Sequence, residues 1–291
     1  MQSSLQIALS KAISKAVGES FEISELALQS GGCINEAWIV SSGSQKYFVK
    51  LNAPDQGAMF AAEAEALSEI LHTGTIGAPQ PITHGVSETH SFLVLEALDL
   101  KIRSDNWSHM GRDLARLHRS TRQHFGWHRN NTIGSTPQRN KWADDWTEFF
   151  IEQRLSPQIR LALKNGHHFS HTEELLKQVT RILKKHRPEA SLLHGDLWSG
   201  NAGFLDDGTP VIFDPATYYG DRETDIAFSE FFGGFGLQFY KAYNTEWPLE
   251  AGYESRKEVY NLYHLLNHLN LFGSSYAEQT NKSINSLLRM R

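Results

Sequence analysis

The sequence is poor in cysteine, has no long apolar run and shows no excess of basic residues. Cys33 is the single cysteine among 291 residues, which excludes an internal disulfide and suits the reducing cytoplasm. No apolar run approaches the about 20 residues that span a bilayer, and Lys11 and Lys15 interrupt the N-terminal segment where a signal peptide needs an apolar core. The formal net charge of -5 argues against nucleic acid as a partner, because phosphate binding normally requires a basic excess. We therefore expect a cytoplasmic protein that binds neither membranes nor nucleic acid.

The composition that is present is that of a globular protein. Apolar residues make up 40% of the sequence and charged residues 21%, and the length allows two domains or one large one. Near the start, Leu5, Leu9, Ile13 and Val17 recur at helical spacing. This spacing predicts an amphipathic helix at the N-terminal end of the sequence.

Residues 191–214 carry the densest pattern of the sequence, SLLHGDLWSGNAGFLDDGTPVIFD. His194-Gly195-Asp196 is followed by Asn201, five positions after the aspartate. Two short apolar runs come next, and the Asp-Gly between them predicts a β-hairpin. The second run ends at another carboxylate, Asp214.

These groups match the requirements of phosphoryl transfer from ATP. Asp196 is suited to orient the attacking hydroxyl and accept its proton, while Asn201 and Asp214 offer oxygen ligands for Mg²⁺. The spelling HGDxxxxN is similar to the catalytic loop HRDxxxxN of protein kinases. A His-Gly-Asp alone would indicate only a turn, but the amide, the hairpin and the terminal carboxylate at this spacing favour a kinase.

Lys50 lies near the end of a predicted strand over residues 46–51, the third along the chain. Kinases carry at this place the lysine that contacts the α- and β-phosphates of ATP, whereas without context it would be a solvent-facing lysine. The helix predicted over residues 59–71 offers Glu63 and Glu65 as partners. We favour Glu63, because it lies beside the apolar stripe of this helix, and expect Glu65 to be solvated.

Gly31 and Gly32 lie between two predicted strands near the start of the chain. Two glycines allow the backbone to approach a phosphate closely, as a loop covering ATP requires. Alone, such a pair more often marks a plain turn. Cys33 follows them, and we expect either an ordinary loop residue or a thiol that links oxidation to dimer formation.

Glu96, Ala97 and Leu98 follow a predicted strand at the point where the sequence changes from apolar to polar. In a two-lobed kinase this position is the hinge, whose backbone pairs with adenine. We therefore place a lobe boundary here, with an N-lobe over residues 1–97 and a C-lobe over residues 98–291.

Residues 125–155 begin as a long polar loop and end in an aromatic helix. Gln138, Asn140 and two further asparagines of the loop, Asn130 and Asn131, could bind a polyhydroxy substrate. They could equally satisfy backbone groups of the protein.

Asp225 precedes an apolar run at the start of a predicted helix. We expect it to brace the catalytic loop from a buried position. His118, at the end of the helix predicted over residues 107–118, reads as a core or capping residue.

The phrase HGDLWSGN, followed by FDPATYYGDRETDIAFSE and preceded by GSTPQRNKWADDWTEFFIEQRL, resembles the fructosamine kinase family, also called ketosamine-3-kinases or protein-ribulosamine kinases. The resemblance covers nearly the whole chain, and Trp198 separates it from the related aminoglycoside and choline kinases. It implies an α+β, protein-kinase-like fold, in which a small antiparallel sheet with one main helix precedes a larger, mostly helical C-lobe. It also implies ATP-dependent phosphorylation of the 3-hydroxyl of ketosamines on amines or protein lysines, after which the adduct decays and frees the amine.

Matching positions carry the family's functional roles onto this chain. The resemblance implies a catalytic base, two Mg²⁺ ligands, a pair that orients the phosphates, and an adenine hinge: Asp196, Asn201 with Asp214, Lys50 with Glu63, and Glu96 to Leu98. For the substrate we expect Trp198 and one of two tyrosines, Tyr218 or Tyr219, to pack on the sugar or its amine side, with Asp221 as a candidate for its ammonium.

Two departures from the protein-kinase pattern matter. Pro215 and Ala216 follow Asp214 where protein kinases have Phe-Gly, and Gly195 stands where they have an arginine. Without that arginine there is no clamp for a phosphorylated activation loop, so we expect a constitutively competent small-molecule kinase. An aminoglycoside- or choline-type kinase and a non-catalytic nucleotide-binding pseudokinase are the alternatives.

Overall fold

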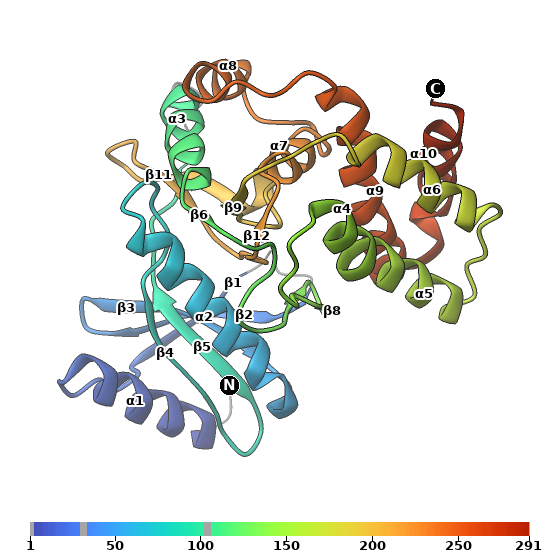
Figure 1. Ribbon diagram of the computed structural model, residues 1–291. Coiled ribbons are helices and arrows are strands. Elements are labelled where there is room, and N and C mark those ends of the chain that lie inside the picture. Colours follow the sequence, from blue (N-terminus) through green and yellow to red (C-terminus); the bar gives the residue numbers. More distant parts are fainter. Residues whose placement is uncertain (1–2, 30–33, 102–105, 291) are drawn as a thin grey trace. The chain divides into compact units, whose positions relative to one another are not determined.

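The chain divides by its internal contacts into two units (Figure 1). The first unit comprises residues 1–103 and 203–214, and the second comprises residues 104–202 and 215–291. The computed structural model describes residues 3–29, 34–101 and 106–290. The lobe boundary expected at residue 97 stays a prediction.

An antiparallel five-stranded sheet forms the centre of the first unit, with the strand order β1-β2-β3-β5-β4. Its strands are β1 (Glu25–Gln29), β2 (Glu36–Ser42), β3 (Gln45–Asn52), β4 (Pro81–Val86) and β5 (Ser91–Glu96). Two helices, α1 (Ser3–Val17) and α2 (Gly57–His72), accompany it, with a short 3-10 turn at Pro54–Gln56. The strands and helices predicted in this part of the chain are confirmed.

The N-terminal helix packs on the sheet as its spacing predicted. Leu5, Leu9 and Ile13 of α1 are buried in one cluster with Val49 and Leu51 of β3. Because side chains alternate along a strand, Lys50, between Val49 and Leu51, faces the other side of the sheet. This alternation directs Lys50 away from α1.

The hairpin predicted from Asp-Gly is confirmed as β10 (Ala202–Phe204) and β11 (Pro210–Ile212). Gly77 bonds to β11 on both of its backbone groups, at 3.1 Å to Pro210 O and 2.9 Å from Ile212 N. A Cβ atom at Gly77 would lie 2.7 Å from the Val211 side chain, so glycine permits this close approach. These bonds fix the hairpin that ends just before Asp214 within the first unit.

The second unit is mainly helical. Its helices are α3 (Trp107–His118), α4 (Trp146–Phe149), a π-helical segment (Phe150–Leu155), α5 (Ser156–Lys164), α6 (Thr172–Leu183), α7 (Glu223–Ser229), α8 (Leu237–Glu246), α9 (Tyr253–Phe272) and α10 (Ala277–Arg289), with 3-10 turns at Ser199–Asn201 and Gly273–Tyr276. The sequence did not reveal α5 or α8. In α8 the glycines and aromatic residues just before it obscured the helical spacing.

A small sheet supports the HGD segment from within the second unit. Strand β9 (Ala190–Leu192) lies between β6 (Thr121–Arg122) and β12 (Tyr219–Gly220), and pairs antiparallel with both. Residues 125–155, expected to begin as a loop, instead contain the short hairpin β7 (Asn131–Ile133) and β8 (Thr136–Gln138). Across the described residues, no helix combines the length and apolarity needed to cross a membrane.

Candidate active site

Lys50 lies at the centre of a charged cluster in the first unit. Its Nζ atom donates to Glu63 Oε1 at 2.5 Å and to Asp214 Oδ1 at 2.6 Å. Lys50 lies in strand β3, Glu63 lies in α2, and Asp214 lies two residues after the end of β11. Of the two candidate glutamates, Glu63 makes this contact, while Glu65 is exposed.

Burial and charge act in opposite directions on this cluster. Lys50 is only 5% exposed. Burial alone would lower its pKa, but the charges of Asp214 and Glu63 and the hydrogen bonds to them raise it above the ordinary value. Burial raises the pKa of Glu63, against the opposing effect of Lys50. Lys50 is therefore held as a fixed cation, and the exposed side of Asp214, whose side chain is 47% accessible, faces solvent.

Asp196 and Asn201 meet in the second unit, where a turn of 3-10 helix brings the amide back to the aspartate. Asn201 Nδ2 donates to the backbone oxygen of Asp196 at 2.9 Å and to its carboxylate Oδ2 at 3.2 Å. Asp196 N donates to His194 Nδ1 at 3.2 Å. The spacing of five residues thus produces a direct contact that fixes the Asp196 side chain.

Asp225 holds the backbone of the HGD segment. Its Oδ2 atom accepts from His194 N at 2.7 Å, and its Oδ1 atom accepts from Gly195 N at 2.8 Å. Asp225 lies in the first turn of α7 in a buried position. The predicted brace is confirmed by these two bonds.

His118 extends this brace deeper into the second unit. Its Nε2 atom lies 3.1 Å from Asp225 Oδ2, and its Nδ1 atom lies 2.7 Å from Tyr243 Oη. A carboxylate only accepts, so Nε2 carries the proton and donates to Asp225, while Nδ1 accepts from the tyrosine. Burial lowers the pKa of His118, despite the opposing hydrogen bond to Asp225. Sequence reasoning missed this contact, because His118 and Asp225 are 107 positions apart and no local pattern links them.

Gly195 has a backbone conformation that requires glycine. Its φ angle is +84°, and a Cβ atom there would lie 2.2 Å from the carbonyl oxygen of Ala216. The amide of Ala216 in turn donates to His194 O at 2.9 Å. Gly195, which stands where protein kinases have arginine, therefore has no room for a side chain, because the backbone of Ala216 lies against it.

The residues expected to pair with adenine, Glu96 to Leu98, lie at the end of β5 and just after it. Glu96 ends β5, where its N–H donates to Gln80 O at 2.8 Å, and its carboxylate accepts from Gln80 N at 3.2 Å. Ala97 and Leu98 follow outside the strand and are half-buried. Gly31, Gly32 and Cys33 lie outside the described residues.

Two of the residues expected to contact substrate differ in accessibility. Trp198 is half-buried and meets Phe232 edge-on, with ring centroids 5.9 Å apart. Tyr218 is buried, and the guanidinium of Arg154 lies 3.9 Å from its ring centroid. Tyr219, the other candidate tyrosine, is also buried. Trp198 is thus the most accessible of these three aromatic residues.

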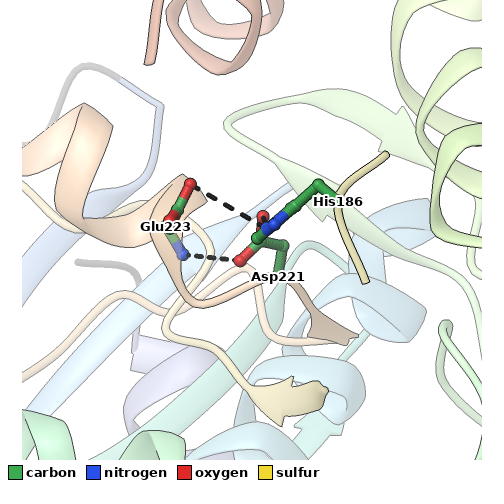
Figure 2. A group of neighbouring side chains, drawn as sticks. All are labelled: His186, Asp221 and Glu223. Carbon is green, nitrogen blue, oxygen red and sulfur yellow. Dashed lines mark hydrogen bonds and ion pairs between the residues drawn. The ribbon is translucent and has the colours of Figure 1, made fainter. Parts of the chain in front are cut away.

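Asp221 belongs to a buried charged cluster with His186 and Glu223 (Figure 2). The imidazole nitrogen and carboxylate oxygens that could ligate a metal ion all lie within 4.8 Å of one another. His186 Nε2 lies 2.8 Å from Asp221 Oδ2, which also accepts from Tyr260 Oη at 2.5 Å. The other Asp221 oxygen accepts from Glu223 N at 3.0 Å. These contacts occupy both oxygens of a residue that is 1% exposed, and they argue against the expected contact with a substrate ammonium, which stays a prediction.

Glu223 is also saturated by a partner. Arg256 donates to its two carboxylate oxygens at 2.6 and 2.8 Å. A cation site needs carboxylate and imidazole atoms that are free to ligate. This cluster is instead a charge-compensated network that connects α7 to α9.

The structure as a whole matches an experimentally determined one closely. The crystal structure of a protein named as a candidate fructosamine-3-kinase, from Haemophilus somnus, superposes with a TM-score of 0.93 at 34% identity and covers 98% of this chain and 100% of its own. The fold is therefore α+β and of the two-lobed kinase type, as predicted. Fold and site together define the class: an ATP-dependent phosphotransferase.

Sequence comparison defines the family within that class. The family model for fructosamine kinase matches residues 5–290. A protein named as a probable ketoamine kinase, from Synechocystis, is 47% identical over 284 residues, which cover 97% of this chain and 96% of the relative. The chloroplastic protein-ribulosamine 3-kinase of Arabidopsis thaliana is 40% identical, with 94% and 85% covered. The chain belongs to the fructosamine kinase family, which decides against the aminoglycoside- or choline-type and pseudokinase alternatives.

Proposed function

We propose that this protein transfers the γ-phosphoryl group of ATP to the 3-hydroxyl of ketosamines, the fructosamine or ribulosamine adducts of amines and protein lysines. The phosphorylated adduct then decays and releases the amine, so that the protein removes glycation damage. The observation that carries the proposal is the Asp196 and Asn201 contact within a chain of this family. We further propose that it acts in the cytoplasm.

Asp196 is proposed as the residue that orients the 3-hydroxyl and accepts its proton. Its carboxylate is held by Asn201, and the backbone on its N-terminal side is held by Asp225. A carboxylate fixed in this way keeps one oxygen directed at the hydroxyl, which lowers the entropy cost of reaching the reactive geometry.

Lys50 is proposed to contact the α- and β-phosphates, with Glu63 holding the lysine in place. Because its pKa is raised, Lys50 keeps its positive charge throughout the physiological range. The backbone of Glu96 to Leu98 is proposed to pair with adenine, and Gly31 and Gly32 to cover the phosphates.

Asn201 and Asp214 are proposed as ligands of Mg²⁺, and the donor atoms fit this ion. Asn201 makes both of its bonds to Asp196 through Nδ2, so its amide oxygen is the atom suited to a metal. Asp214 accepts from Lys50 through Oδ1, and its carboxylate offers a further oxygen to the metal. Such hard oxygen donors suit Mg²⁺, which when bound neutralises charge on the phosphates.

Trp198 is proposed to pack on the sugar or on the amine side of the substrate, with Tyr218 and Asp221 as further candidates. The half-buried ring of Trp198 is two residues from Asp196 and is supported by Phe232. An aromatic face of this kind binds the apolar side of a sugar while leaving its hydroxyls free.

A substrate screen tests the proposal. ADP release is measured with fructosamine-lysine, ribulosamine-lysine, choline and an aminoglycoside, each with Mg²⁺-ATP. We expect release with one or both ketosamines and none above background with the other two compounds. Turnover of choline or the aminoglycoside without turnover of a ketosamine would overturn the assignment.

A further inference from the structure

The hairpin β7–β8 carries polar side chains that are buried against backbone rather than exposed to a substrate. Gln138, at the end of β8, is 1% exposed. Its Nε2 atom donates to the carbonyl of Ala216 at 2.9 Å and to Asn131 Oδ1 at 2.9 Å. Asn131 in turn donates to the carbonyl of Thr217 at 2.8 Å. Two amides thus bind two consecutive carbonyls of the segment that follows Asp214.

The same amides are held from behind by further side chains. Tyr263 of α9 donates to Gln138 Oε1 at 2.7 Å. Asn140 donates to Asn131 Oδ1 at 2.8 Å and accepts from Arg154 at 2.7 Å. Each amide in this group therefore has its orientation determined by a partner on either side.

Arg154 supports this arrangement as a buried cation. The side chain is fully buried, at 0% exposure, and among its described contacts no carboxylate neutralises it. Its partners are backbone carbonyls, Asn140 and the faces of aromatic rings, including Tyr218 at 3.9 Å. Burying a charge without a counter-ion is costly. In return, the guanidinium orients Asn140 through a hydrogen bond and Tyr218 through contact with its ring.

The segment that these amides bind also touches the catalytic loop. Ala216 N donates to His194 O at 2.9 Å, and Ala216 O occupies the space that a side chain at Gly195 would need. Leu193 N donates to Tyr218 O at 3.1 Å. The backbone of His194 and Gly195 is therefore held on one side by Asp225 and on the other by residues 216–218.

We infer that Gln138 and Asn131 are positioning residues for Asp196, acting through the backbone of residues 216–217. In protein kinases the segment after the metal-binding aspartate is ordered by a phosphorylated residue bound to the arginine of the catalytic loop. This chain has glycine at that place, and the β7–β8 amides supply a permanent attachment instead. The inference rests on the proposed function, since it assigns Asp196 a role in turnover.

The test replaces Gln138 with methionine, which has a similar shape but no amide. The matched control is Gln178→Met, which removes a Gln Nε2 bond of 2.7 Å to a backbone carbonyl, that of Met290, in the same unit but away from residue 216. With the ketosamine turned over by the wild type, we expect Q138M to lower kcat by about tenfold to a hundredfold, as small misplacements of a catalytic group do. We expect the KM for ATP to change less than about twofold. A loss confined to kcat would show that Q138M affects the transition state and not the binding of ATP.

A second measurement keeps the inference testable without a known substrate. Hydrogen exchange, followed by mass spectrometry on peptides covering residues 191–201, should be faster in Q138M and unchanged in Q178M. Equal exchange and equal kcat in the two variants would overturn the inference. A wild type that turns over no ketosamine would contradict the proposed function, while the exchange result would still decide the attachment.

Discussion

Replacing Asp225 with asparagine would perturb the backbone of His194 and Gly195, next to the proposed catalytic residue Asp196. The change keeps the shape of the side chain, but it removes the negative charge and turns one of the two acceptor atoms into a donor. Oδ1 accepts from Gly195 N, while Oδ2 accepts from His194 N and from His118. An asparagine has one oxygen and one NH₂ group, so whichever way the amide turns, a donor faces at least one backbone N–H.

The magnitude follows from that mismatch. A buried N–H without an acceptor costs about 1–3 kcal/mol, and hydrogen bonds to a charged group contribute about 1.5–3 kcal/mol. We therefore expect D225N to lose about 1–3 kcal/mol in the free energy of unfolding. In a chain of this size each kcal/mol lowers Tm by about 2–4 °C. Because the orphaned N–H lies in the segment that carries Asp196, we also expect kcat to fall by about tenfold or more.

The assay compares Tm and ketosamine-dependent kcat with those of D207N. Asp207 is an exposed carboxylate that also accepts a backbone N–H, from Thr209 at 2.9 Å, so the chemical change is the same at the surface. If D225N matched D207N in both Tm and kcat, the bracing role assigned to Asp225 would be refuted.

Two further predictions concern the Lys50 cluster and the buried histidine. Glu63→Gln should raise the KM for ATP and lower kcat, because it removes one of the two charges that hold Lys50, whereas E65Q on the exposed face of the same helix should leave both unchanged in steady-state kinetics. For His186, burial lowers the pKa, but the hydrogen bond and charge of Asp221 raise it above 6.5 overall, so its contribution to stability is complete below pH about 6.5 and is lost as pH rises through the folded pKa. The Tm difference between wild type and H186Q should therefore be largest near about pH 6 and shrink toward about pH 9; a difference that grows with pH would contradict the assignment.

Much of the fold followed from patterns within single segments. The spacing of Leu5, Leu9 and Ile13 predicted α1, and Asp-Gly between apolar runs predicted the hairpin before Asp214. Lys50 and Glu63 could be paired because each lies at a definite place in its own strand or helix. Such local patterns carry enough information because the backbone periods of strand and helix fix which side chains face the core.

What the sequence could not give were contacts between distant segments and the burial of polar groups. Nothing near His118 indicates Tyr243, which lies 125 positions away. Gln138 lies in a polar stretch whose side chains could bind either a substrate or backbone groups, and only the fold shows that its amide binds the carbonyl of Ala216. The sequence likewise suggests Asp221 as a candidate partner for a substrate ammonium, and only the fold shows that His186 and Tyr260 contact its carboxylate.

The most direct test of the account is the position of the phosphoryl group in the product. Wild type and D196N are incubated with Mg²⁺-ATP and the preferred ketosamine, and the product is examined by phosphorus and carbon NMR. The account predicts a phosphate on the 3-oxygen of the sugar with the wild type, and no product with D196N although ATP still binds. Phosphate on a different oxygen, or near-normal product formation by D196N, would contradict it.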